Sequence, residues 1–323
     1  VKKELQFFID KKVPQVKFVD RTFNCRHDHA MAIWKYLIAH DNGITNFHFE
    51  VAADLLNEEE IELIRRMRPG LIQLEIGVQS TNTDTIREIR RTMRLEEVRE
   101  HVARIKEKGN IHQHLDLIAG LPYEDIKSFR KSFDDVYSMR PDQLQLGFLK
   151  VLKGSYMQEM QQEYELRYKD EPPYEVLSTK WLPYSDVIEL KGIEEMVEIY
   201  YNSGQFTHVV EALVENYASA YQMYQDLWQY YEEHDYMGIQ HRRSARYEIV
   251  LAFVKEKYPE QADVMRELLT YDYYLRENAK SRPEFAGDYL VEKNVARAFY
   301  EKEEEKFRKK VCFGGIPRIY RPR

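Results

Sequence analysis

The sequence predicts an α/β fold, in which a partial, open barrel of parallel strands alternates with helices and is followed by an all-helical region. Through the first 156 residues, short β-branched and aromatic segments alternate with helical patterns of about a dozen residues, as in βαβ units. A closed eight-unit barrel needs about 250 residues, so this region is too short to form one. From about Asp186 onward the apolar spacing is helical.

Five strands and five helices are predicted in the first region. The strands cover residues 16–20, 46–52, 71–78, 111–119 and 143–151. The helices cover residues 1–11, 28–40, 57–68, 95–108 and 125–139. Asp28 and Asn57 are candidate N-caps, and Gly109 is a helix-stop signal. Because the chain starts on a helix, at Val1 rather than Met, we expect that the first barrel strand lies upstream and is missing from this sequence.

Four helices are expected in the second region, at residues 186–201, 206–234, 241–258 and 260–278. The predicted organisation is a partial barrel at residues 1–156, a linker at 157–185 and a helical domain at 186–323, with an extended tail from residue 311. We interpret the helical domain as a lid or substrate domain over the open barrel.

Composition limits the function classes. The net charge of -7 and pI of about 5.9 argue against a nucleic-acid partner, and the basic run at 306–310 follows three glutamates, as in a solvated helix end. No segment approaches the ~18 apolar residues of a membrane span. The two cysteines, Cys25 and Cys312, are too few for a disulfide framework, which favours a cytoplasmic location.

One face of the predicted sheet is polar on strand after strand. Side chains alternate across a strand, so this face would carry His48, Glu50, Gln73, Glu75, Gly77, Gln79, His112, His114, Asp116, Gln143 and Gln145. An ordinary closed barrel fills its centre with branched apolar residues, and unpaired buried polar groups cost a few kcal/mol each. We therefore expect a wide polar concavity that holds a ligand.

Two short motifs mark the expected ligand side of the sheet. Gly77-Val78-Gln79-Ser80 and Gly120-Leu121-Pro122-Tyr123-Glu124 each follow a predicted strand. Each motif alone is more often an ordinary strand end or turn. Together, at the carboxyl ends of neighbouring strands, they indicate a binding site.

Other interpretations stay open. His48, Glu50, His112 and His114 could form a zinc-type site in a metal-dependent barrel hydrolase, or they could be hydrogen-bonded barrel histidines. The helical half could instead be the partner surface of a non-enzymatic interaction module. Its tyrosines could line a large ring-shaped ligand, although core packing is the commoner role at helical spacing: Tyr200, Tyr201, Tyr221, Tyr224, Tyr230 and Tyr231.

The order of the motifs resembles that of radical S-adenosylmethionine (SAM) barrels. Residues 18–24, Glu50, the Gly77 motif and the segment from Asp116 to Pro122 follow one another as in that superfamily. The chain is similar to the branch with an N-terminal cobalamin-binding domain and a helical C-terminal domain, which includes magnesium-protoporphyrin monomethyl ester cyclase-like proteins, and to oxygen-independent coproporphyrinogen oxidase. The resemblance is clearest over residues 1–156.

The resemblance implies a set of cofactors and partners. A 4Fe–4S cluster on three cysteines binds SAM, and one electron cleaves SAM to a 5′-deoxyadenosyl radical that abstracts hydrogen from a small-molecule or larger, tetrapyrrole-like substrate. It also implies an electron donor such as ferredoxin or flavodoxin, and an upstream domain that holds cobalamin. Membranes and nucleic acids are not expected partners.

The resemblance also implies roles for individual residues. Glu50 would contact the SAM amino group, Arg91 its carboxylate, and Gln79 and Asp116 its ribose, with Ser80 beside them. The backbone of Gly120 and Pro122 would flank the adenine. The CxxxCxxC loop that holds the cluster is absent from this chain. We therefore expect no metal ligand here and an inactive fragment of a radical SAM oxidoreductase, cyclase or methyltransferase.

Overall fold

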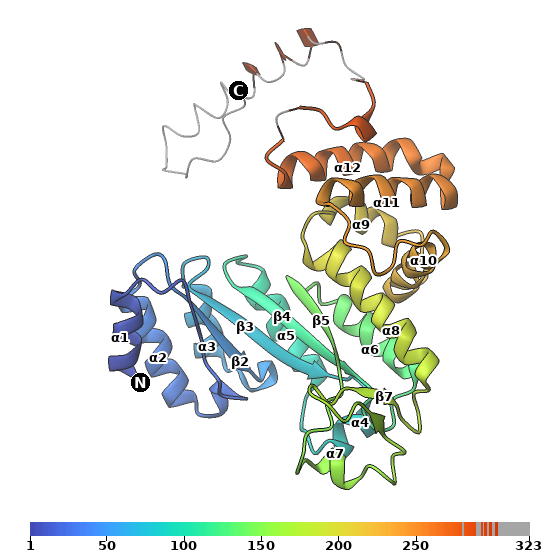
Figure 1. Ribbon diagram of the computed structural model, residues 1–323. Helices are drawn as coiled ribbons and strands as arrows, with labels where there is room; N and C mark the ends of the chain where they lie inside the picture. The colour runs from blue at the N-terminus through green and yellow to red at the C-terminus, as the bar shows by residue number, and fades with distance from the viewer. Residues whose placement is uncertain (280, 289–291, 293, 296, 299–300, 303–323) are drawn as a thin grey trace. The chain divides into compact units, whose positions relative to one another are not determined.

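The computed structural model describes residues 1–279, 281–288, 292, 294–295, 297–298 and 301–302 (Figure 1). The chain divides into two compact units, Val1–Glu277 and Asn278–Arg323. Cys312, the basic run at 306–310 and the predicted tail from residue 311 lie outside the described residues. The domain boundaries expected at residues 156 and 185 stay a prediction.

A five-stranded parallel sheet forms the first part of the Val1–Glu277 unit, in the order β1-β2-β3-β4-β5 (Figure 1). Its strands are β1 (Gln15–Lys17), β2 (Asn46–Val51), β3 (Ile72–Gln79), β4 (His112–Ala119) and β5 (Gln143–Phe148). The helices around it are α1 (Lys2–Asp10), α2 (His27–Ala39), α3 (Glu58–Arg65), α4 (Thr83–Glu88), α5 (Leu95–Lys106) and α6 (Ile126–Tyr137). The predicted α/β fold with an open parallel sheet is therefore confirmed.

The helix ends follow local chemistry. Asn57 caps α3 in a capping box, in which its side chain accepts from the Glu60 amide while the Glu60 carboxylate accepts from the Asn57 amide. The N-cap expected at Asp28 is wrong, because Arg26 occupies the N-cap position of α2 and Asp28 lies in its first turn. Gly109 follows α5 with φ +64, a left-handed conformation that favours glycine.

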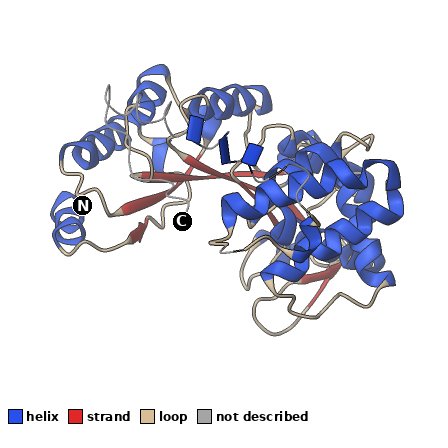
Figure 2. Ribbon diagram, turned by 90° about the horizontal axis from the view of Figure 1, so that it is seen from above, coloured by secondary structure: helices blue, strands red, loops and turns tan. Residues whose placement is uncertain are grey.

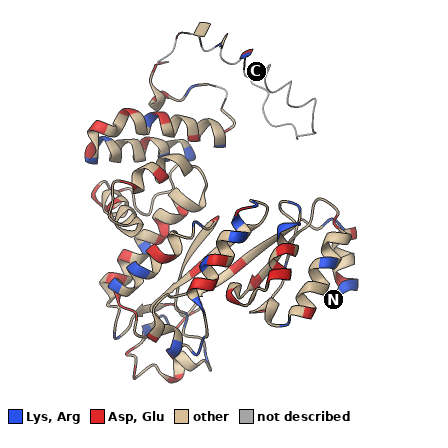
Figure 3. Cartoon of the chain, turned by 180° about the vertical axis from the view of Figure 1, so that it is seen from behind, with Lys and Arg blue, Asp and Glu red and all other residues tan. Residues whose placement is uncertain are grey.

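The apolar face of the sheet is covered by helices, and Figure 2 shows helices lined along one side of the strands. Alternate residues of β3 and β4 on that face are fully buried, among them Leu74, Leu115 and Leu117. Along the helices, Lys and Arg are interspersed with Asp and Glu (Figure 3). One such pair joins two helices, since Arg104 of α5 lies 2.6 Å from Glu58 of α3.

The second part of this unit is helical from residue 184. It contains α8 (Tyr184–Val197), a π-helical turn (Glu198–Asn202), α9 (Thr207–Val214), α10 (Ala220–Glu233), α11 (Arg243–Lys257) and α12 (Ala262–Arg276). The single helix expected at 206–234 is wrong: α9 ends at Val214, and Ser219 begins α10 as its N-cap. The tyrosines singled out from the sequence, except the half-buried Tyr201, are core residues, none of them more than 3% exposed.

This helical region packs against the side of the sheet, on α6 and β5, rather than as a lid over the strand ends. Asp134 of α6 accepts a hydrogen bond from the first turn of α10, at the Tyr221 amide (2.9 Å). Glu189 of α8 accepts from Arg130 of α6 (2.9 Å). Asn202 bonds both the amide and the carbonyl of Leu144 in β5.

The carboxyl ends of β4 and β5 are met instead by residues 152–182, which we call the strap. The strap contains α7 (Tyr156–Glu159) and an antiparallel pair, β6 (Arg167–Tyr168) and β7 (Val176–Ser178). The Val176 amide donates to the carbonyl of Leu149, directly after β5. No strand or helix was expected in this part of the chain.

Candidate functional site

The strand register brings polar side chains from neighbouring strands into rows on the face opposite the helices. One row contains Lys17, His48, Gln73 and His112. The next contains Glu50, Glu75, His114 and Gln143, and a third contains Gly77, Asp116 and Gln145. The polar face expected from the alternation of the sequence therefore exists, and carboxylates dominate its centre.

Glu75 is the centre of a charged cluster. Its Oε2 lies 2.8 Å from Lys17 Nζ and 2.8 Å from His48 Nε2. Burial alone would raise the pKa of Glu75, but the ion pair with Lys17 and the neighbouring His48 outweigh it and lower this pKa. Burial and the positive charge of Lys17 lower the pKa of His48, which therefore favours its neutral form.

Glu50 lies among other carboxylates. Burial and the negative charges of Glu75 and Asp116 raise its pKa. Asp116 Oδ1 lies 3.0 Å from His114 Nε2, yet it is buried without a hydrogen bond of good geometry within the described residues. A buried polar atom without a hydrogen-bond partner destabilises the folded protein unless a ligand or solvent supplies one.

Arg91 comes to the same place from the loop after α4. Its Nη2 donates to the carbonyl of Gly77 in β3 (2.5 Å). Burial lowers the pKa of Arg91, while Asp54, Glu50 and Asp116 favour its charged form. Arg91 is thus a cation held beside the carboxylates of the polar face.

Gln79 ends β3 with an irregular turn. Its φ is +70, and the pairing of β3 with β4 shifts register between Gly77 and Gln79. The Gln79 side chain folds back over Gly77, where a Cβ atom would lie 2.4 Å from Gln79 Nε2. Only glycine fits under this side chain without displacing it. Gln79 Oε1 is buried and accepts no hydrogen bond within the described residues.

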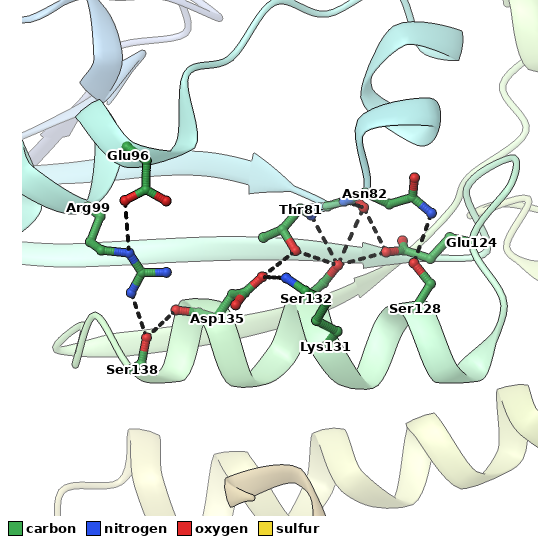
Figure 4. A network of polar contacts seen from close by, with 11 residues as sticks. Thr81, Asn82, Glu96, Arg99, Glu124, Ser128, Lys131, Ser132, Asp135 and Ser138 are labelled. Carbon is green, nitrogen blue, oxygen red and sulfur yellow. Dashed lines mark hydrogen bonds and ion pairs between the residues drawn. The ribbon is translucent and has the colours of Figure 1, made fainter.

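Ser80 does not join this group. It is fully buried, and its Oγ donates to Glu124 Oε1 (2.6 Å), which also accepts from Ser132 of α6 (2.8 Å). Figure 4 shows the surrounding network, in which Thr81 donates to Asp135 (2.7 Å). Burial raises the pKa of Glu124 to about 7, although its two hydroxyl partners act against the rise.

Gly120 and Pro122 lie in the second loop of the site, after β4. The Pro122 carbonyl accepts from Thr85 of α4 (2.8 Å). Gly120 has φ +88, and a Cβ atom there would lie 2.8 Å from Val176 of the strap. Together with the Ser80–Glu124 bond, these contacts join the two strand-end loops to each other and to the strap.

The structure does not bring the alternative metal ligands into one group. His48 faces Glu75, His114 faces Asp116, and His112 is exposed. Among the residues that the structure describes, no group of three or more His, Cys, Asp or Glu side chains is arranged to hold a metal ion. Cys25 is an exposed free thiol.

Comparison with known families divides the chain in two. A model described as Radical SAM superfamily matches residues 1–136. Residues 1–136 are thus similar to radical SAM domains. A second model, described as Protein of unknown function (DUF4080), matches residues 162–312. The segment that matches the radical SAM model contains β1 to β4 and most of α6, and therefore all seven residues predicted to bind the cofactor.

Two curated relatives match part of the chain. One is the oxygen-independent coproporphyrinogen-III oxidase-like protein HemZ of Bacillus subtilis (strain 168), 26% identical over 36% of this chain and 23% of that protein. The other is the probable threonylcarbamoyladenosine tRNA methylthiotransferase of Pyrococcus abyssi, 29% identical over 31% of this chain and 25% of that protein. The matched part thus spans about a quarter of either relative.

Solved structures with some similarity include two radical SAM proteins. The methyltransferase TsrM from Kitasatospora setae, with cobalamin and an iron–sulfur cluster bound, has a TM-score of 0.44 at 13% identity, over 53% of this chain and 34% of that one. Coproporphyrinogen III oxidase HemN from Escherichia coli has a TM-score of 0.43 at 18% identity, over 63% and 46%.

Several site features were not expected from the sequence. The ion pairs of Glu75, the bond from Arg91 to Gly77 and the network around Glu124 all join residues distant in the chain. One signal was present in the sequence: the alternation that turns Gln79 toward the polar face turns Ser80 away from it.

No described helix is both long and apolar enough to cross a membrane.

Proposed function

We propose that this chain is the SAM-binding part of a radical SAM enzyme. The observation that supports this most is the gathering of Glu50, Asp116 and Arg91 around Gly77, at the carboxyl end of β3. Burial and the neighbouring carboxylates Glu75 and Asp116 raise the pKa of Glu50, and the negative charge gathered there favours binding of a further cation. SAM has two positive centres, an ammonium and a sulfonium, and also a carboxylate for an arginine.

Each residue then has a stated task. Glu50 accepts hydrogen bonds from the ammonium group, and Arg91 donates to the methionyl carboxylate, for which a guanidinium fork is well suited. Gln79 and Asp116, whose Oε1 and Oδ1 have no hydrogen-bond partner within the described residues, accept from the ribose hydroxyls. The backbone of Gly120 and Pro122 flanks the adenine. Ser80 supports the loop from beneath.

The chain supplies binding and orientation rather than the redox centre. When bound to a reduced iron–sulfur cluster, SAM provides a radical for hydrogen abstraction from substrate. The two cysteines of this chain are too few for the three thiolates that such a cluster takes, so its residues do not fit the cluster. The task of the polar face is to hold SAM in one orientation and exclude water around it.

We propose only the step that radical SAM reactions share, and not the type of the overall reaction. The two curated relatives have names of different reaction types, an oxidase-like protein and a methylthiotransferase. Cobalamin dependence, a tetrapyrrole or other large substrate, and an electron donor such as ferredoxin or flavodoxin stay proposals that rest on the resemblance. A cytoplasmic location is proposed because two cysteines are too few for a disulfide framework.

Calorimetric titration of SAM into the full protein tests the proposal. We expect Arg91→Ala to weaken SAM binding at least about tenfold, because it removes charge-assisted hydrogen bonds. Glu50→Gln should weaken it by a similar factor. Arg66→Ala is the matched control, because Arg66 is exposed at the end of α3, and it should leave the affinity unchanged.

Titration of S-adenosylhomocysteine adds a second criterion, since it lacks the sulfonium charge. The carboxylates of the polar face should make SAM the tighter ligand by several-fold. Absence of SAM binding, or equal binding by the wild type, Arg91→Ala and Glu50→Gln, would refute the proposed function.

A further inference from the structure

The loop that holds Arg91 begins at a strained turn. Arg90 lies two residues after the end of α4 and has φ +55, a left-handed conformation for which glycine is the usual residue. The turn is closed by two backbone bonds, from the Arg90 amide to the Arg87 carbonyl and from the Arg91 amide to the Ile86 carbonyl, each 3.0 Å. The direction in which Arg91 leaves the helix therefore depends on this turn.

The Arg90 side chain makes a contact that a glycine at this position could not make. Its guanidinium carbon lies 4.1 Å from the centre of the Tyr156 ring, within the range of a cation–π contact. Tyr156 is the first residue of α7, in the strap. The strained turn thus directs a cation onto the segment that covers the strand ends.

Glu88, the last residue of α4, makes a second connection to the strap. Its Oε1 accepts a hydrogen bond from Tyr156 (2.9 Å) and another from the buried Tyr164. These two hydroxyl groups lower the pKa of Glu88, so its charged form is the one that is held. We call the four residues Glu88, Arg90, Tyr156 and Tyr164 the latch.

The strap also reaches the second loop of the site. Tyr164 packs against Trp181, with ring centres 5.4 Å apart, and Trp181 packs against Tyr123 at 4.7 Å. Tyr123 directly follows Gly120-Leu121-Pro122. The strap therefore contacts both the loop with Arg91 and the loop proposed to flank the adenine.

We propose that Glu88 and Arg90 are positioning residues, which fix Arg91 for the methionyl group of SAM by holding the end of α4 against the strap. This inference rests on the proposed function, because it needs SAM at Arg91. It adds that the strap, which belongs mostly to the C-terminal family match, takes part in SAM binding without touching SAM.

The test combines hydrogen–deuterium exchange with SAM titration in the full protein, for Glu88→Ala, Arg90→Gly and Tyr156→Phe. Each variant should speed exchange in both residues 83–91 and 152–182, and weaken SAM binding by about tenfold or less, since each removes one or two contacts. Tyr156→Phe keeps the ring and removes only the hydroxyl, so it separates loss of the latch from loss of packing.

Arg140→Gly is the matched control. Arg140 also has a left-handed conformation (φ +53) at the end of a helix, α6, but lies outside the latch. It should change neither SAM affinity nor exchange in the strap. Unchanged exchange in all three latch variants, or faster exchange with unchanged SAM affinity, would overturn the inference. If Arg91→Ala itself leaves SAM binding intact, the proposed function fails first and the latch loses its role with it.

Discussion

Glu124 should make the stability of this protein fall as the pH rises from about 4.5 to about 7. The carboxyl group is buried and 1% exposed, and its pKa is raised by burial from 4.5 to about 7. In the unfolded chain it loses its proton near pH 4.5, whereas in the folded protein it keeps it until about pH 7. Between these values the folded state binds more protons, so acid stabilises it.

The size of the effect follows from the two pKa values. At about 1.4 kcal/mol for each tenfold change in proton affinity, the difference corresponds to roughly 3.5 kcal/mol of free energy of unfolding. This stability is present below pH 4.5 and is lost progressively by about pH 7. Glu124→Gln cannot ionise and keeps an oxygen that accepts from Ser80 and Ser132, so this pH dependence should be absent in the variant.

Urea unfolding at half-unit steps from pH 5 to 8 measures this prediction. The informative quantity is the wild-type free energy of unfolding minus that of Glu124→Gln, because titration of other groups cancels in it. Glu59→Gln, at an exposed position on α3, is the control and should retain the wild-type slope. A difference that stays flat, or that rises with pH, would show that the reasoning about Glu124 is wrong.

Two further predictions concern packing. Asp272→Asn should lower the free energy of unfolding, measured by urea titration, by about 2–4 kcal/mol. This fully buried carboxylate accepts hydrogen bonds from the amides of His208 and Val209 at the start of α9 and from the His208 ring. A loss below ~0.5 kcal/mol would contradict the prediction. Gly120→Ala should lower the free energy of unfolding clearly more than Gly109→Ala, for which a loss of about 1 kcal/mol is expected. Both glycines have positive φ, but a Cβ atom at position 120 would meet the strap, whereas nothing lies within 4 Å of one at position 109. Equal losses would argue against the contact with the strap.

The sheet could be predicted from the sequence because burial imposes a strict two-residue period. Phe47 and Phe49 face the helices while His48 and Glu50 face away, as their alternation indicates. The N-cap at Asn57 was also readable, since its chemistry lies within four residues. These features depend on local sequence alone.

The remainder depends on contacts between distant segments. The helix α4 is six residues long, too short for a periodic pattern, and the strap has two strands of two and three residues. The grouping of Arg91 with Glu50 requires the register of β2 on β3 and the turn after α4 at once. Ser80 was expected at the site by family resemblance, while the structure turns it toward Glu124.

The π-helical turn at Glu198–Asn202 has a consequence for any attempt to express the barrel region alone. Asn202 occupies the outer edge of β5 by bonding both backbone groups of Leu144, in the manner of a missing neighbouring strand. An exposed strand edge is a template for intermolecular pairing and aggregation. A truncated protein that ends near residue 156 would uncover this edge. Removing one residue from the π turn would rotate Asn202 by about 100° and uncover the same edge, so we expect this deletion to promote aggregation as truncation would.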